Sequence, residues 1–173
     1  MTESEAWLLQ VESDFAAANN VLDNEDPSTC CQSISKCQQV VEKSINVIDA
    51  VLREQGILNG RVKAQHYPLR MINRLVRLPI QKEPDLAANM KRLFIRWGGD
   101  IYDLCDLAPE LPLKDELYQR NTEYPFQNED ETWTAPAAAN SFTSDQVKRF
   151  IFTARNLRRE AQEISTAAKL NKL

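Results

Sequence analysis

The chain has 173 residues, of which 43% are hydrophobic and 27% charged, and its formal net charge is −4. This length predicts a single domain over residues 1–173 with one hydrophobic core, and the net charge favours no particular class of partner. The chain has only four glycines and no runs of alternating apolar and polar residues, which argues against a β protein and favours an all-α fold.

The cysteine and histidine content argues against a metal centre. The four cysteines include no CxxC pair, and the chain has one histidine, so the sequence predicts no zinc site and no cofactor. No apolar run approaches the length of a membrane-spanning helix, and the N-terminal residues are acidic, unlike those of a signal peptide. We therefore expect a reduced, cytoplasmic protein that makes no membrane contact.

Two long helices are predicted in the first third of the chain. Residues 3–23 have apolar side chains three and four residues apart, and residues 27–54 continue this spacing after Asp26 as N-cap and Pro27 in the first turn. The apolar face of the second helix comprises Cys30, Ile34, Cys37, Val41, Ile48 and Leu52. This helix is the longest amphipathic stretch in the first half, so we expect it to occupy the centre of a bundle.

A third, shorter helix is predicted over residues 68–78, because Pro68 suits a first helical turn. Its basic residues lie four and three positions apart and form one stripe, which comprises Arg70, Arg74 and Arg77. The stripe has two interpretations, a phosphate-binding surface or a solvated helix face.

The last two long helices are predicted over residues 84–107 and from Thr143 almost to the end of the chain. Gly98 and Gly99 interrupt the first of them, which predicts either a kink or a close approach of another helix. The second begins with a capping box formed by Thr143 and Gln146, with Phe142 and Val147 as a hydrophobic staple.

Residues 108–141 form a long acidic connection between these two helices. We expect one short helix near residues 113–120 within it. Trp133 lies in this connection and is either exposed to a partner or holds the connection against the helices. Four long helices with one or two short ones predict an up-and-down bundle.

Several segments, in order along the chain, resemble the HEPN domain, the higher-eukaryote and prokaryote nucleotide-binding domain. The first helix, AWLLQVESDFAAANNVL, looks like the start of that domain, and CQQVVEKSINVI at 37–48 is similar to the family signature QQAAEKALKA. RNTEYPF at 120–126 resembles the family's RYP stretch, although Glu123 stands where arginine is usual. The matching signature residues are Gln38, Gln39, Glu42 and Lys43.

The resemblance implies a candidate ribonuclease motif, since some HEPN proteins cleave RNA without a metal through an Arg-x(4–6)-His pattern. Arg61 and His66 fit this pattern, with arginine to stabilise the phosphorane and histidine to accept a proton. The tyrosine that usually follows the histidine by two positions is here Tyr67, immediately after it. A structural or helix-capping role for His66 is the other interpretation.

The resemblance also implies partners and a second group of candidate residues. HEPN proteins generally form homodimers, and in toxin–antitoxin pairs the usual partner is a minimal nucleotidyltransferase. Lys43 is either an ordinary salt-bridged residue or a phosphate-binding residue in a dimer groove, which the Arg70, Arg74 and Arg77 stripe would extend. The sequence therefore predicts a nucleotide- or RNA-interacting protein, possessing ribonuclease activity if Arg61 and His66 are catalytic. The alternative is a non-catalytic dimerisation or interaction module.

Overall fold

The described part of the chain is almost entirely helical, as the sequence predicts. The computed structural model describes residues 1–22, 29–60, 74–75, 84–105, 126–127, 130–135 and 142–170. Within these ranges the long helices are α1 (Glu3–Leu22), α2 (Cys30–Glu54), α4 (Pro84–Cys105) and α5 (Ser144–Lys169). None of the described helices is long and apolar enough to cross a membrane.

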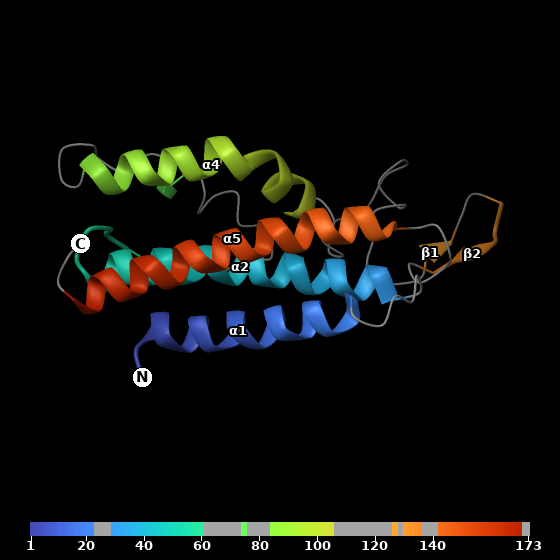
Figure 1. Ribbon diagram of the computed structural model, residues 1–173, viewed down its shortest axis with the longest axis horizontal. Helices are drawn as coiled ribbons and strands as arrows, with labels where there is room; N and C mark the ends of the chain where they lie inside the picture. The colour runs from blue at the N-terminus through green and yellow to red at the C-terminus, as the bar shows by residue number, and fades with distance from the viewer. Residues whose placement is uncertain are drawn as a thin grey trace.

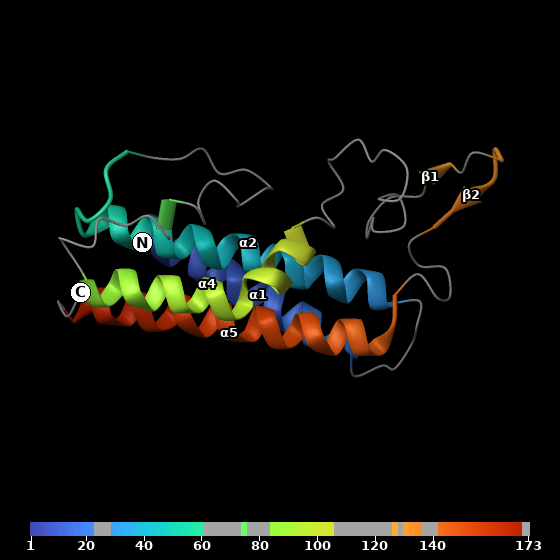
Figure 2. The ribbon, with the colours of Figure 1, turned by 90° about the horizontal axis from the view of Figure 1, so that it is seen from above.

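Helix α2 lies at the centre of the arrangement. It contacts α1, α5 and α4, and α5 also contacts α1 and α4 (Figure 1). Seen from above, the four helices run roughly along the same axis, with α5 beside α4 (Figure 2). The position of α2 agrees with the prediction that the longest amphipathic helix of the first half of the chain is the central one.

The burial of α2 exceeds that of an ordinary amphipathic helix. All six residues of its predicted apolar face, Cys30, Ile34, Cys37, Val41, Ile48 and Leu52, are buried. Polar side chains on its other faces are buried as well, among them Gln38, Glu42 and Asp49. Because neighbouring helices enclose it, the polar residues of α2 must find partners within the protein.

Helix boundaries follow the sequence signals closely but not completely. Helix α2 begins at Cys30 rather than at Pro27, and Pro27 lies outside the described residues, as does Asp26. Of the third predicted helix only residues 74–75 are described, and both are helical. The short helix expected near residues 113–120 also lies outside the described ranges.

Gly99 of α4 does not mark a close approach of another helix. A Cβ atom added at Gly99 would meet no atom within 4 Å among the described residues, so the expectation of tight packing there is wrong for this glycine. Both views show α4 changing direction toward its C-terminal end (Figures 1 and 2), which agrees with the alternative of a kink.

The acidic connection contains a small hairpin that the sequence did not predict. Strands β1 (Phe126–Gln127) and β2 (Trp133–Thr134) pair antiparallel. At the turn, Asp130 Oδ1 accepts hydrogen bonds from the backbone nitrogen and hydroxyl of Thr132 at 3.1 and 2.6 Å. Two-residue strands are too short to produce an alternating pattern, which explains why they were missed. Trp133 is 68% exposed, in agreement with the first of its two interpretations.

The capping box at the start of α5 is present as predicted. The Thr143 nitrogen donates to Gln146 Oε1 at 2.8 Å, and the Gln146 nitrogen donates to Thr143 Oγ1 at 3.2 Å. Phe142 and Val147 are both buried, as a hydrophobic staple requires. The start of α5 is therefore defined by local sequence alone.

Replacing Thr143 by alanine removes the acceptor for the Gln146 backbone nitrogen. We expect the free energy of unfolding to fall by about 1 kcal/mol, as for other helix N-caps, in urea titrations followed by circular dichroism. Thr143→Ser keeps the acceptor and serves as the matched control. Equal destabilisation by the two substitutions would contradict a capping role.

Burial of Cys37 makes the stability of the fold sensitive to alkaline pH. Burial raises the pKa of this thiol to about 12, whereas an unfolded cysteine titrates near pH ~8.5. Above pH ~8.5 the unfolded chain therefore loses a proton that the folded chain retains, so stability falls as the pH rises toward 12. Between pH ~9 and ~11, the free energy of unfolding of Cys37→Ala should fall less steeply with pH than that of the parent chain. The two slopes should differ by up to about 1.4 kcal/mol per pH unit. Identical slopes for the variant and the parent chain would show that this thiol titrates alike in both states.

Candidate functional site

Two of the four signature residues of α2, Gln39 and Lys43, lie in a polar cluster where α2 contacts α1. Asp14 of α1 is buried, and Lys43 Nζ donates to its Oδ2 while Lys36 Nζ lies 3.5 Å from its Oδ1. Lys36 also donates to Gln39 Oε1 at 2.9 Å. We call Asp14, Lys36, Gln39 and Lys43 the Asp14 cluster. This cluster joins α2 to α1 by charge as well as by apolar packing.

The position of Lys43 bears on its two interpretations. Its side chain is 21% exposed, and its ammonium group has a counter-ion within the same chain. This is the salt-bridged arrangement that the first interpretation describes. The pairing with a buried carboxylate reduces the charge that Lys43 could offer to a phosphate.

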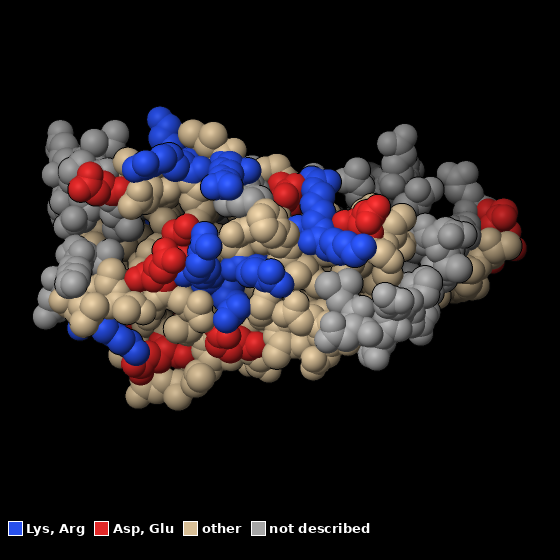
Figure 3. Space-filling model, viewed as in Figure 1, with Lys and Arg blue, Asp and Glu red and all other residues tan. Residues whose placement is uncertain are grey.

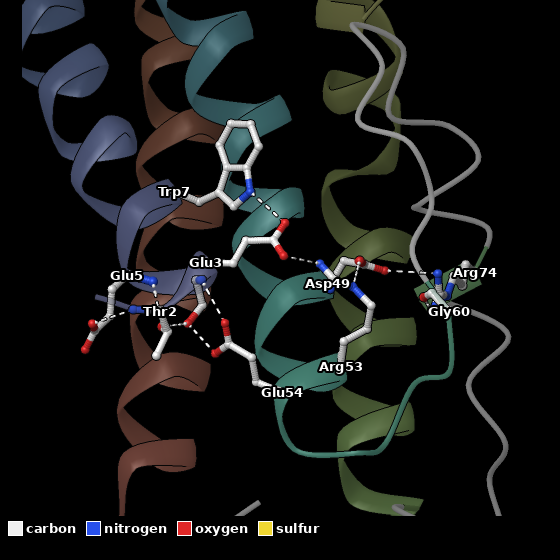
Figure 4. Close-up of polar contacts among 10 residues, drawn as sticks. Thr2, Glu3, Glu5, Trp7, Asp49, Arg53, Glu54, Gly60 and Arg74 are labelled. Atoms are coloured by element: carbon white, nitrogen blue, oxygen red, sulfur yellow. Dashed lines mark hydrogen bonds and ion pairs between the residues drawn. The ribbon is translucent and has the colours of Figure 1, made fainter.

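A second cluster of charged residues lies where α2 ends, and it centres on Asp49 (Figure 4). The Asp49 side chain is 1% exposed, and its Oδ2 accepts from Arg53 Nε at 2.8 Å. Arg74 Nη1 lies 3.5 Å from Asp49 Oδ1. On the side of α1, Arg53 Nη2 lies 3.2 Å from Glu3 Oε2. We call Glu3, Asp49, Arg53 and Arg74 the Asp49 cluster.

Further hydrogen bonds tie the beginning of α1 to this end of α2. Trp7 Nε1 donates to Glu3 Oε1 at 3.4 Å, and the Ser4 hydroxyl and backbone nitrogen donate to the Glu54 carboxylate at 2.7 and 3.0 Å (Figure 4). The Asp49 cluster therefore extends from the first turn of α1 to residue 74. These contacts fix three separate segments of the chain against one another.

The hydrogen bonds of the Asp49 cluster stabilise the charged form of Arg53. Partial burial lowers the pKa of Arg53, but the hydrogen bonds from its guanidinium to Asp49 and Glu3 outweigh this effect and the net pKa is raised. Asp49 Oδ1 has no hydrogen-bond partner within the described residues, and its contact with Arg74 is a longer ion pair. A carboxylate this deeply buried depends on both guanidinium groups for compensation.

Arg74 also holds the backbone that precedes the candidate ribonuclease motif. Its Nη2 donates to the carbonyl oxygens of Asn59 and Gly60, both at 2.7 Å. Gly60 has a φ of +70°, a conformation that favours glycine. The chain therefore leaves a fixed point at residue 60, immediately before Arg61.

Several of the predicted site residues lie outside the described part of the chain. These residues are Arg61, His66, Arg70 and Arg77. Of the predicted arginine stripe, Arg74 is described, and its guanidinium bonds to groups within the chain. Among the described residues, no group of three histidine, cysteine, aspartate or glutamate side chains could hold a metal ion.

Sequence reasoning missed the two carboxylates on which these clusters depend. Helical spacing alone did not single out Asp14 or Asp49, because it does not reveal that a second face of the helix is covered. The sequence of α2 does contain a pattern that indicates a second polar face. Glu42 and Asp49 are seven positions apart, which places both on one helix face. An acid on a covered face requires a basic partner.

Comparison of the chain with protein-family models, with curated proteins and with solved structures found no match.

Because Asp49 and Arg74 form a partly buried pair, we expect them to be energetically coupled. In a double-mutant cycle with Asp49→Asn and Arg74→Gln, the coupling free energy should be about 1–3 kcal/mol. The exposed pair Arg159 and Glu163, four residues apart with 3.6 Å between Nε and Oε1, is the control and should show about 0.3–0.5 kcal/mol. Equal coupling in both cycles, measured by chemical unfolding, would contradict the role of Asp49 as a buried anchor.

Proposed function

We propose that this protein is a HEPN-like helical domain that interacts with RNA and cleaves it without a metal, through Arg61 and His66. The order of the HEPN-like segments along the sequence and the helical character of the chain support this proposal. We extend it to the fold, which we propose is an up-and-down bundle of four long helices. Consecutive long helices run in opposite directions in Figure 1, which favours this arrangement.

The observation that carries the proposal is the attachment of residues 59–60 to the Asp49 cluster. Arg74 binds both carbonyl oxygens and is itself paired with a buried carboxylate. These two hydrogen bonds hold residues 59 and 60, which immediately precede the proposed catalytic segment, and that segment lies outside the described residues. Restricting the conformations of catalytic side chains is a large part of what an active site contributes.

The proposed reaction uses the ribose 2′-hydroxyl as nucleophile. His66 accepts the 2′-hydroxyl proton, the O2′–P bond forms and the P–O5′ bond breaks, while Arg61 stabilises the negative charge on the phosphorane. The leaving 5′-oxygen also needs a proton. Because the chain has one histidine, an imidazolium donor must come from a second chain, so we propose a homodimer in which His66 of both chains lines one cleft.

The proposal also names a biological setting. A metal-independent HEPN-like ribonuclease fits the toxin of a toxin–antitoxin pair in the cytoplasm, with a minimal nucleotidyltransferase as partner. An adjacent gene encoding such a nucleotidyltransferase would support this setting.

A second candidate function is a non-catalytic dimerisation or interaction module. The engagement of Lys43 with Asp14, and of Arg74 with Asp49, favours this alternative. Two of the four predicted binding cations are thus occupied within the chain. In this alternative they stabilise the helices and bind no nucleotide.

Cleavage of a fluorescent RNA in the presence of EDTA distinguishes the two functions. We expect cleavage by the parent chain, with kcat/KM reduced by about 10²–10⁴ in His66→Ala and by about 10²–10³ in Arg61→Ala. Lys169→Gln, which alters an exposed cation at the far end of α5, is the control and should retain activity.

Undiminished cleavage by His66→Ala would end the ribonuclease proposal. A parent chain that forms dimers in sedimentation experiments but never cleaves RNA would instead support the interaction module.

A further inference from the structure

Positive charge is concentrated in two stretches of this acidic protein. In α4, residues 86–99 contain Lys91, Arg92 and Arg96 and no acid. In α5, residues 146–159 contain five lysines and arginines and again no acid. The whole chain has a net charge of −4, so these two helical stretches carry the opposite charge to the chain as a whole.

The fold places these two stretches next to each other. Asp100 of α4 accepts from Arg149 Nε at 2.7 Å and from the Thr153 hydroxyl at 2.9 Å, so this part of α4 lies against the beginning of α5. The two helices run in opposite directions from that point (Figure 1). The acid-free stretches of α4 and α5 therefore lie along one side of the molecule, where Figure 3 shows lysine and arginine side chains over both helices.

Five exposed arginines form what we call the α4–α5 basic face: Arg92, Arg96, Arg149, Arg155 and Arg159. Carboxylates compensate them only in part. Asp100 pairs with Arg149, and Glu163 lies 3.6 Å from Arg159, with Glu160 also close to this end of the face.

Two of these arginines have no carboxylate partner among the described residues. Arg92 donates only to Asn89 Oδ1 at 3.0 Å and to the Ala88 carbonyl oxygen, and Arg155 lies 6.0 Å from the Phe15 ring centre. Their charge is available to a ligand.

An aromatic side chain lies among the arginines of α5. Phe152 is 51% exposed, three residues after Arg149 and three before Arg155, and Arg159 follows it by seven residues. Residues at these spacings share one helix face. A large apolar ring therefore shares an exposed face of α5 with three arginines, whereas the core-facing side of α5 is buried with Val147, Phe150 and Leu157.

We propose that the α4–α5 basic face binds single-stranded RNA, with the arginines on phosphates and Phe152 stacked on a base. The arginine guanidinium binds phosphate through two parallel hydrogen bonds, and stacking on an aromatic ring holds an unpaired base irrespective of its identity. An anionic membrane is a poorer fit, because the apolar side of α5 is buried in the core and, among the side chains that the structure describes, Phe152 is the one aromatic ring exposed on the face. The inference takes RNA as the ligand from the proposed function but does not depend on cleavage.

The test is fluorescence anisotropy with a fluorescein-labelled 2′-O-methyl oligouridylate of about 12 nucleotides. This probe lacks the 2′-hydroxyl nucleophile, so binding is measured without cleavage. We expect the association constant to fall as the salt concentration rises. A plot of the logarithm of this constant against the logarithm of the salt concentration should have a slope of about −2, as for about three neutralised phosphates on a single strand. Arg92→Gln, Arg155→Gln and Arg159→Gln should each weaken binding about three- to tenfold, and Phe152→Ala about tenfold or more.

Two control variants make the result specific. Lys169→Gln removes one exposed cation from the same helix outside the face and should leave the dissociation constant unchanged. Phe152→Trp keeps an aromatic ring and should restore the binding that Phe152→Ala loses. Circular dichroism of each variant excludes loss of fold as the cause.

The proposal is overturned if the four variants of the face bind the probe like Lys169→Gln, or if the protein binds vesicles of anionic phospholipid but not the probe. His66→Ala separates this inference from the proposed ribonuclease activity, since that variant should lose cleavage and retain binding.

Discussion

The enclosure of α2 is the constraint on which the rest of the structure depends. A helix covered by α1, α4 and α5 gains apolar burial along its whole length, and the same burial removes water from its polar side chains. Asp49 shows the consequence most clearly. Its side chain is only 1% exposed, and the guanidinium groups of Arg53 and Arg74 approach its two oxygens.

This constraint explains why the end of α2 organises segments that are distant in the sequence. Arg53 satisfies Asp49 and Glu3 together, which joins α2 to the first turn of α1. Arg74 satisfies Asp49 and then the carbonyl groups of residues 59–60, which fixes the chain that follows Gly56. The same arginine that compensates Asp49 thus holds residues 59 and 60, which immediately precede Arg61. The position of these two residues follows from the burial of Asp49 in α2 and does not depend on the Arg61 and His66 motif.

Helical spacing was sufficient to predict the four long helices, and capping chemistry the start of α5, because both are local. The Thr143 and Gln146 pair defines the start of α5, and the apolar stripe of α2 predicts its central place. The partners of Lys43 and Arg74 could not be predicted in this way. Asp14 is 29 residues from Lys43, and Asp49 is 25 residues before Arg74, so each pair exists only after the helices have packed. A basic stripe read from one helix therefore does not reveal whether its cations face solvent or a buried acid.

The same reasoning accounts for the cations that remain at the surface. Lys43 and Arg53 of α2 pair with carboxylates of the neighbouring helix α1, Asp14 and Glu3. Such compensation needs a carboxylate on the facing helix. Between α4 and α5 that condition is met at one point, because α4 has no acid from residue 86 to residue 99 and Asp100 is taken by Arg149. Arg92, which is exposed on α4, consequently keeps its charge on the outside of the protein. The α4–α5 basic face of this acidic chain therefore depends more on the absence of carboxylates from these stretches of α4 and α5 than on the number of arginines in them.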